Sequence, residues 1–310
     1  MSLSIVTPHF NDLEGLKQIY TCLLKQTDAS WDWVVVDDCS DDGVRTALRA
    51  YVEAQQDPRI QLLLPPEKSN ASVCRNLGAE KATYQHLVFL DSDDVITEDF
   101  VKNRQVNFED FVVFKHTAVL NKNGTKQVVG SVTSSYLDCF LKARFVWPIT
   151  AILWRKDFFI AIGQFHPKLP RLQDVELAIR ALQHSAHYQV LDNPVDFYYR
   201  VKPIRERKNF VQPVCEAVYL FISDLLDTSK LNKHQLQLLS GYYYLCIKYL
   251  ERSGDVQEVP FVQKNLNLFY KKGYVNISAY LLGLVFLKFY QYKWISGTLF
   301  LRVNRRLFKP

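Results

Sequence analysis

The chain has 310 residues, of which 48% are hydrophobic and 23% are charged, and its formal net charge is +6. These proportions are ordinary for a globular protein, and the length suits one large domain with an appendage. The six cysteines form no Cys-x-x-Cys pair, which favours a reducing compartment and argues against a secreted disulfide scaffold. The first predicted strand begins almost at Met1, so we expect no signal peptide.

Three apolar segments in the first part of the chain predict strands that each run into polar residues. These segments are 3–6, 33–36 and 60–64. The polar residues that follow them include Thr7, Asn11, Asp38, Ser69, Asn70 and Arg75. The helices predicted in this part lie around 13–25, 44–55 and 73–82. Alternating strands and helices predict a mostly parallel sheet flanked by helices, and the polar loops would then meet at one edge of that sheet.

A fourth predicted strand, 87–90, ends in an acidic run with carboxylates at Asp91, Asp93 and Asp94. Crowded carboxylates repel one another unless they share a cation. Mg²⁺ and Mn²⁺ take oxygen ligands and often bridge protein carboxylates to phosphates. An EF-hand is excluded, because Ile96 stands where a calcium loop needs glycine. The alternative is an acidic turn that caps a helix starting near residue 97.

The middle of the chain contains a predicted hairpin. The segments 111–114 and 128–129 flank a turn-forming sequence at 121–125, which is the pattern of two strands joined by a turn. A helix is predicted over 133–143.

Together these motifs resemble the family 2 glycosyltransferases of the GT-A fold. The segments that carry the resemblance are Ser4-Ile5-Val6-Thr7-Pro8 with Asn11, Val34 to Gly43, Arg75-Asn76-Leu77-Gly78 and Phe89 to Asp94. A looser similarity continues to about residue 200, through 152–165 and the helix start at Leu172-Gln173-Asp174. The resemblance implies an α/β fold of the GT-A type, with a Rossmann-like, mostly parallel sheet over residues 1–210 and a helical C-terminal appendage over 211–310. Two positions depart from the family pattern: Gln173 stands where an acidic residue is common, and Ser72 where glycine is common.

The resemblance also implies an inverting, metal-dependent transferase with a nucleotide-sugar donor, UDP-sugars being favoured, and a glycan or lipid-linked acceptor. The residues implied in donor binding are Thr7, Pro8, Asn11, Asp38, Arg75 and Asp91. Asp93 would ligate Mn²⁺ or Mg²⁺. Asp174 would be the general base that removes the proton of the acceptor hydroxyl, with Glu176 as the next candidate.

Some of these residues also have a purely structural interpretation. Asp37 and Asp38 could be solvated turn residues. Asp174 could serve only as a helix cap, and Arg75 could lie on the surface of a helix.

The sequence changes character after about residue 210. Amphipathic helices are predicted near 213–227, 231–252 and 259–272. From residue 259 to 310 there are nine Lys or Arg and no Asp or Glu, so residues 1–258 carry +6 − 9 = −3. The apolar run 277–287 is too short to cross a bilayer, which needs about 20 residues. Aromatic residues between Phe286 and Phe300 interleave with the cations, so we expect this tail to contact an anionic membrane surface. The alternative is a basic helical bundle packed on the catalytic domain.

The resemblance therefore predicts a cytoplasmic bacterial enzyme of surface-polysaccharide or lipid-linked glycan synthesis, peripheral on the inner face of the cell membrane. Nucleic acid is not an expected partner, since no recognition motif is present. A sugar nucleotidyltransferase is disfavoured because the loop after the first strand contains no glycine. The remaining alternative is a catalytically degenerate GT-A protein that acts as a glycan-binding module or membrane scaffold.

Overall fold

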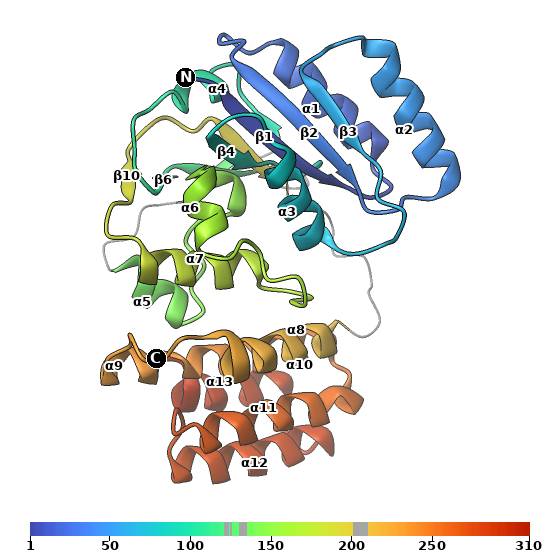
Figure 1. Cartoon of the computed structure of the whole chain (residues 1–310). Helices are drawn as coiled ribbons and strands as arrows, with labels where there is room; N and C mark the ends of the chain where they lie inside the picture. The colour runs from blue at the N-terminus through green and yellow to red at the C-terminus, as the bar shows by residue number, and fades with distance from the viewer. Residues whose placement is uncertain (121–123, 125, 130–134, 201–209) are drawn as a thin grey trace. The chain divides into compact units, whose positions relative to one another are not determined.

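The computed structural model describes residues 1–120, 124, 126–129, 135–200 and 210–310. The chain divides into two compact units, and Figure 1 labels helices and strands of both. Unit 1 comprises Met1–Ser131, Trp147–Pro167 and His184–Pro203. Unit 2 comprises Val132–Val146, Lys168–Gln183 and Ile204–Pro310. The second unit thus contains two segments from the middle of the chain in addition to the predicted C-terminal appendage.

Unit 1 is built on a seven-stranded sheet with the order β10-β6-β9-β4-β1-β2-β3. Its strands are β1 (Leu3–His9), β2 (Trp31–Asp37), β3 (Ile60–Leu63), β4 (His86–Phe89), β6 (Phe111–Phe114), β9 (Ile152–Arg155) and β10 (Gln189–Leu191). All neighbouring strands are parallel except β9, which is antiparallel to β4 and β6. Strands β1, β2 and β4 are buried along almost their whole length, as expected for parallel strands covered on both faces. The predicted α/β class is confirmed.

Unit 1 contains helices between its strands, and the first three of them lie in the intervals predicted for helices. The helices of unit 1 are α1 (Leu13–Leu24), α2 (Asp42–Gln55), α3 (Ala71–Lys81), the short α4 (Phe100–Asn103), the 3₁₀ turn η1 (Ile149–Ala151) and α6 (Lys156–Ala161). Side-chain caps begin two of them, since Asp12 accepts from the backbone of α1 and Asn70 from that of α3. The acidic run does not cap α4, because a short strand separates the two and the helix has no side-chain cap bond.

A second, four-stranded sheet in unit 1 corrects the predicted hairpin. Its order is β5-β11-β7-β8, with β5 (Val95–Ile96), β7 (Thr117–Leu120), β8 (Lys126–Val129) and β11 (Phe197–Arg200). The hairpin is formed by β7 and β8, whereas the segment 111–114 is strand β6 of the main sheet. All residues of β6 are apolar and buried, which suits a strand covered on both faces better than a hairpin arm. The predicted turn residues 121–123 and 125 lie outside the described residues.

A buried ion pair connects α4 to the segment before β11. Arg104 is fully buried, and its guanidinium donates to Asp196 at 2.7 Å while lying over the rings of Phe100 and Phe114. Burial lowers the pKa of Arg104, although Asp196 opposes the effect. The pair holds the two sheets of unit 1 together at this point.

Unit 2 consists of helices. They are α5 (Tyr136–Leu141), α7 (Gln173–His184), α8 (Val211–Leu220) with its π-helical extension η2 (Phe221–Leu225), α9 (Lys233–Leu238), α10 (Ser240–Ser253), η3 (Val256–Glu258), α11 (Val259–Lys271), α12 (Ile277–Gln291) and α13 (Gly297–Phe308). The predicted helix 231–252 is divided between α9 and α10. Helix α5 is shorter than the predicted helix 133–143. Residues 133 and 134 of that prediction lie outside the described residues. Helix α10 packs against α8, α11 and α13. None of the described helices has the length and apolar character needed to cross a membrane.

Two aromatic residues of the tail are buried, although they were predicted to lie at the surface. Tyr290 and Phe300 are buried and stack on each other with ring centroids 4.3 Å apart, so they belong to the core of unit 2. Tyr292 and Trp294 are exposed, at 62% and 70%. The expected mixture of aromatic and cationic side chains at the surface therefore holds for part of the tail only.

Candidate functional site

The loops that follow β1, β2 and β4 meet at one edge of the main sheet. Residue His9, at the end of β1, is in register with Asp37, at the end of β2, and Val6 of β1 is in register with Phe89 of β4. Because these strands are parallel, their carboxyl ends lie together, as in other open α/β sheets. The polar residues predicted from each strand end are therefore brought to the same edge.

A buried network connects the first two loops. The Nδ1 atom of His9 lies 2.8 Å from Oδ1 of Asp37, and the Ser40 hydroxyl donates to the same oxygen at 2.5 Å. Burial acts to raise the pKa of Asp37, but the hydrogen bonds from His9 and Ser40 outweigh it and the pKa is lowered. Asn11, with a φ of 52°, joins this network through its backbone N–H, which donates to the Ser40 hydroxyl at 2.8 Å. Asp37 is thus a buried anchor of the loop and not a solvated turn residue.

Asp38 and Thr7 also make contacts that shape this edge. The Oδ1 atom of Asp38 accepts from the backbone N–H of Ser69 at 2.6 Å and from its hydroxyl at 2.9 Å. Only 9% of Asp38 is exposed, so it is not a solvated turn residue either. Thr7 is fully buried, and its hydroxyl accepts from the indole N–H of Trp33 at 2.9 Å. The buried Thr7 side chain therefore stabilises the end of β1 from inside the fold. Asp38 fixes the loop between β3 and α3.

The loop after β1 also exposes an aromatic ring that the sequence reasoning did not select. Phe10 is 47% exposed, and the ammonium group of Lys68 lies 3.1 Å from its ring centroid. Pro8 directly precedes this loop and is half-buried. The ring and the ammonium group add an apolar and a cationic contact to the site.

The acidic run is held by contacts from three directions. Asp91 accepts from the guanidinium of Arg75 at 2.5 Å. The Ser92 hydroxyl donates to Asp12 at 2.9 Å. A Cβ atom at Gly15 would lie 2.4 Å from the Ser92 carbonyl oxygen, so only glycine lets the first turn of α1 approach the run this closely.

Arg75 is not a surface residue. It is 7% exposed, its guanidinium lies 5.5 Å from the ring centroid of Phe165, and its Nε atom is buried without a hydrogen-bond partner among the described residues. A buried guanidinium facing the acidic run can neutralise Asp91 or hold an anion that enters the site. The surface alternative for Arg75 is excluded.

The third carboxylate of the run, Asp94, is buried. It accepts from the Thr150 hydroxyl at 2.8 Å. Burial raises the pKa of Asp94 well above its ordinary value, and the neighbouring charges of Asp91 and Asp93 raise it further. The edge of the sheet therefore carries a concentration of negative charge beside Asp93, which is half-buried.

The residues of the acidic run fit a divalent cation. Their carboxylate oxygens are the ligands that Mg²⁺ and Mn²⁺ prefer. A cation would relieve the repulsion among these carboxylates, which adds to the effect of burial on the pKa of Asp94. Within the described ranges, no group of three or more His, Cys, Asp or Glu residues is arranged to hold a metal by itself. The arrangement suits an ion that is held by one or two carboxylates and completed by substrate phosphate and water.

In unit 2, the predicted base Asp174 lies in the first turn of α7. The helix begins at Gln173, so Asp174 is its second residue and not its cap, and the side chain is exposed. Glu176 is buried, and both of its oxygens accept from Arg180, at 2.7 and 2.6 Å. Asp174 is thus the accessible carboxylate at the start of this helix, whereas Glu176 is occupied by an ion pair.

Comparisons with known proteins agree with this arrangement. The family model described as "Glycosyl transferase family 2" matches residues 4–156. The protein named as the teichuronic acid biosynthesis glycosyltransferase TuaG of Bacillus subtilis (strain 168) is 35% identical over 210 residues, covering 62% of this chain and 81% of that protein. The amylovoran biosynthesis glycosyltransferase AmsB of Erwinia amylovora is 26% identical over 217 residues, covering 65% of this chain and 70% of that protein.

A solved structure is similar over almost the whole chain. The crystal structure of S. aureus TarS 1-349 in complex with UDP-GlcNAc has a TM-score of 0.62 at 16% identity, and the match covers 99% of this chain and 91% of that one. The match covers 55% of the longer TarS chain. At this level of identity the similarity shows the GT-A fold.

Proposed function

The chain belongs to glycosyl transferase family 2 and is a glycosyltransferase, and from this premise we propose that it moves a sugar, with inversion, from a UDP-sugar to a hydroxyl group of a glycan or lipid-linked acceptor. The observation that carries the proposal is the edge of the main sheet. There Asp38, Asp91 and Asp93 follow neighbouring parallel strands at the same edge of the sheet, and Arg75 contacts Asp91. Names of the relatives point to bacterial surface polysaccharides as the product class.

In the proposed mechanism, the residues of this edge bind and orient the donor. Asp38 accepts a hydrogen bond from an N–H of the pyrimidine base, and Arg75 faces the diphosphate. Pro8 and Asn11 shape the loop beside the nucleotide. UDP is favoured because an acidic acceptor group at Asp38 suits the uracil N–H, and because the structurally similar TarS is solved with UDP-GlcNAc.

Asp93 would hold the divalent cation, Mn²⁺ or Mg²⁺, and Asp91 would face the ribose or the surroundings of the cation. When bound, the cation stabilises the negative charge on the departing nucleoside diphosphate. Asp174 takes the proton of the acceptor hydroxyl as that oxygen attacks the anomeric carbon. A single displacement from the opposite face inverts the configuration of the sugar.

We further propose that the protein works at the inner face of the cell membrane. The support comes from α12, whose outward residues Ile277, Leu281, Leu282 and Val285 are between 43% and 53% exposed. Cationic residues of the same tail lie beside them in the sequence, at Lys288 and Lys293. Apolar and cationic side chains together are the features of a helix that lies on an anionic lipid surface.

A screen of nucleotide sugars tests the proposed reaction. Thermal unfolding should shift upward with UDP and UDP-sugars in the presence of Mn²⁺, since a ligand at a hundredfold excess over its Kd stabilises the folded state by about 2.7 kcal/mol. Hydrolysis of one UDP-sugar in the same samples would show that the site is catalytic. Binding without hydrolysis or transfer of any donor would favour the alternative of a degenerate GT-A scaffold.

A further inference from the structure

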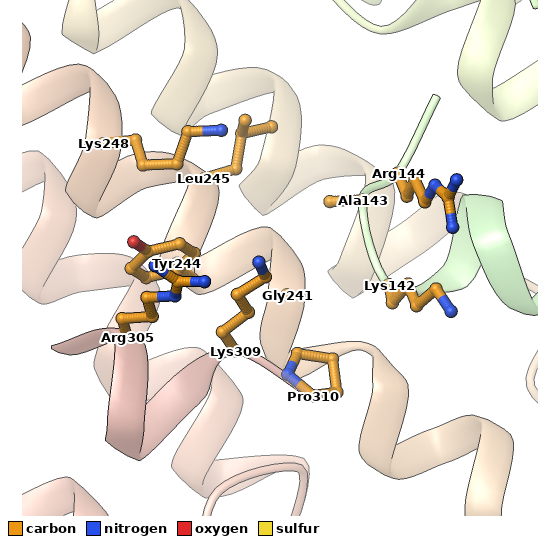
Figure 2. A pocket seen from close by; sticks show the side chains of 10 residues that line it. All are labelled: Lys142, Ala143, Arg144, Gly241, Tyr244, Leu245, Lys248, Arg305, Lys309 and Pro310. Atoms are coloured by element: carbon orange, nitrogen blue, oxygen red, sulfur yellow. The ribbon is translucent and has the colours of Figure 1, made fainter. Parts of the chain in front are cut away.

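Unit 2 contains a pocket. None of the residues assigned above to donor binding or catalysis lines it. It has a volume of about 630 Å³ and lies between the loop after α5, helix α10 and the end of α13. Figure 2 shows Lys248, Arg305 and Lys309 on one side of the pocket and Lys142 and Arg144 on the other.

The lining of this pocket is strongly cationic. Five of its lining residues are Lys or Arg and none is Asp or Glu. Over the ranges that the structure describes, none of these five side chains forms an ion pair with a carboxylate. Five cations around one cavity repel each other, and a bound anion would relieve this repulsion.

One wall of the pocket is a turn whose backbone is fixed by contacts with α10, although most of the cationic side chains around the pocket are exposed. Gly241 of α10 is buried, and a Cβ atom there would lie 2.5 Å from the Lys142 carbonyl oxygen. The turn has Ala143 in the left-handed region, with a φ of 54°, and is closed by the Arg144 N–H, which donates to the Cys139 carbonyl at 2.9 Å. The Tyr242 hydroxyl also donates to the Phe140 carbonyl at 2.7 Å. These contacts fix Lys142 and Arg144 opposite the cations of α10 and α13.

The size and the chemistry of the pocket select the class of ligand. A volume of about 630 Å³ is far larger than one inorganic anion and is typical of sites for organic ligands. Arg binds phosphate oxygens in pairs, and Lys binds them as a point charge. Tyr244 and Leu245 add an aromatic and an apolar surface to the lining, which suits the carbon skeleton of a sugar.

We infer that this pocket holds the phosphate groups of a phosphate-bearing glycan acceptor. The inference rests on the proposed function, because it assigns to the pocket the acceptor of the same reaction. In the proposed mechanism, Arg75 would face the phosphates of the donor and Asp93 would hold the cation, and both residues belong to unit 1. We therefore assign the pocket in unit 2 to the second substrate, the acceptor, whose phosphate groups its cations would bind.

Binding of inorganic pyrophosphate to the full chain without metal tests the pocket directly. The pocket variant is Lys248→Glu with Arg305→Glu, both at exposed positions. The matched control is Lys271→Glu with Arg302→Glu, which are exposed residues of α11 and α13 outside the pocket and change the net charge equally. Calorimetry should show an affinity about tenfold lower for each cation removed from the pocket and less than about a twofold change in the control. Equal pyrophosphate affinity in the two variants would overturn the inference.

Kinetics and vesicle binding then identify the source of the phosphate. The pocket variant should raise the KM for a phosphate-bearing acceptor and leave UDP-sugar hydrolysis unchanged; an unchanged acceptor KM would reject the acceptor assignment. The same variant should bind phosphatidylglycerol vesicles as well as the control does, and a loss of vesicle binding alone would assign the pocket to lipid headgroups instead. If the wild-type protein transferred no sugar at all, the proposed function would fall, while the pyrophosphate titration would still decide whether the pocket binds phosphate.

Discussion

At the scale of single residues, Asp93 is the position on which the metal assignment depends. It is half-buried in the acidic run, next to Asp94, whose pKa is raised by burial and further by the neighbouring charges of Asp91 and Asp93. We expect Asp93→Ala to lower transfer by a factor of about 10² or more, as for the loss of a group that stabilises transition-state charge. Mn²⁺-dependent UDP binding, measured by calorimetry, should weaken with it.

The control for this variant is Glu98→Ala, an exposed carboxylate close in sequence whose side chain is not part of the site. It should retain wild-type activity and wild-type UDP binding. If Asp93→Ala bound UDP as tightly as the wild type and with the same dependence on Mn²⁺, the metal would have to be assigned to other residues.

A substitution at Asp174 distinguishes a loss of catalysis from a loss of donor binding. Asp174→Asn keeps the size of the side chain and removes its ability to accept a proton. Turnover should fall by a factor of about 10² to 10⁴, while the affinity for the UDP-sugar should stay the same. Steady-state kinetics with a titration of donor measures both quantities.

A matched control exists in α6, where Asp157 is also the second residue of a helix and is exposed. Asp157→Asn should leave turnover unchanged. Near-normal turnover in Asp174→Asn would show that the base lies elsewhere, and Glu176 is a poor substitute because Arg180 holds both of its oxygens.

The sequence located the residues at the strand ends but not their buried partners. Asp38, Asp91 and Asp93 could be predicted because each follows an apolar run, and the edge of a sheet is where such residues meet. The pair of His9 and Asp37 could not, since the two residues are 28 positions apart and neither lies in a pattern that specifies the other. Contacts of this kind depend on the register of neighbouring strands, which a single sequence does not state.

At the scale of secondary-structure elements, the turn between α2 and β3 is anchored by one carboxylate. Asp57 accepts from the Arg59 guanidinium at 2.9 and 2.7 Å and from the Tyr20 hydroxyl of α1 at 3.1 Å. The hydrogen bonds from Arg59 lower the pKa of Asp57 to about 2, against the opposing effect of burial. Its side chain is 8% exposed, so solvent screens these contacts only weakly.

This lowered pKa predicts how stability depends on pH. A carboxylate with a depressed folded-state pKa stabilises the fold above its unfolded pKa of about 3.9, and this contribution is lost as the pH falls toward the folded-state pKa. Asp57→Asn should therefore lower the free energy of unfolding at pH 7 by up to about 2 kcal/mol. The difference from the wild type should be smaller at pH 3, as urea unfolding at both pH values would measure. Glu53→Gln, at an exposed position on α2, should show little change, and an Asp57→Asn deficit that is equal at both pH values would contradict the assignment.

Helices and strands were predicted correctly where the hydrophobic pattern of a segment and the polar residues at its ends indicated the same element. The helices α1, α2 and α3 each begin near a polar residue and follow a clear strand. The hairpin failed because the apolar segment 111–114 has no alternation, and a short apolar run fits either a hairpin arm or a central strand. The pairing of this segment with β9 and β10 shows that it is a central strand. Those strands begin only at residues 152 and 189, far from the segment in the sequence.

At the scale of the whole molecule, the segregation of charge could be predicted, but the pocket that it helps to form could not. The sequence shows nine cations and no carboxylate after residue 258. Three of the cations around the pocket, Lys248, Arg305 and Lys309, come from α10 and from the end of the chain, whereas Lys142 and Arg144 come from the turn after α5. Only the packing of Gly241 against that turn brings these distant groups together.

The outward face of α12 leads to the last prediction, that the protein docks on anionic membrane without crossing it. Leu281 and Val285 are 53% and 43% exposed on this helix, while its residues Gly283 and Leu287 are buried in the bundle. Removing the tail would uncover the core of unit 2, so substitution of exposed residues is the better test. The full chain should sediment with phosphatidylglycerol vesicles at low salt and be released at 1 M salt, where the Debye length is about 3 Å.

The variant Leu281→Ser with Val285→Ser should bind these vesicles more weakly, because apolar area buried in the lipid contributes to the affinity. Leu24→Ser is the control, since Leu24 is equally exposed, at 57%, but belongs to α1 of unit 1. If the full chain ignored vesicles at low salt, the apolar face of α12 would have to serve a protein partner. If it stayed bound at 1 M salt, apolar insertion would dominate over the attraction between the cations of the tail and the lipid headgroups.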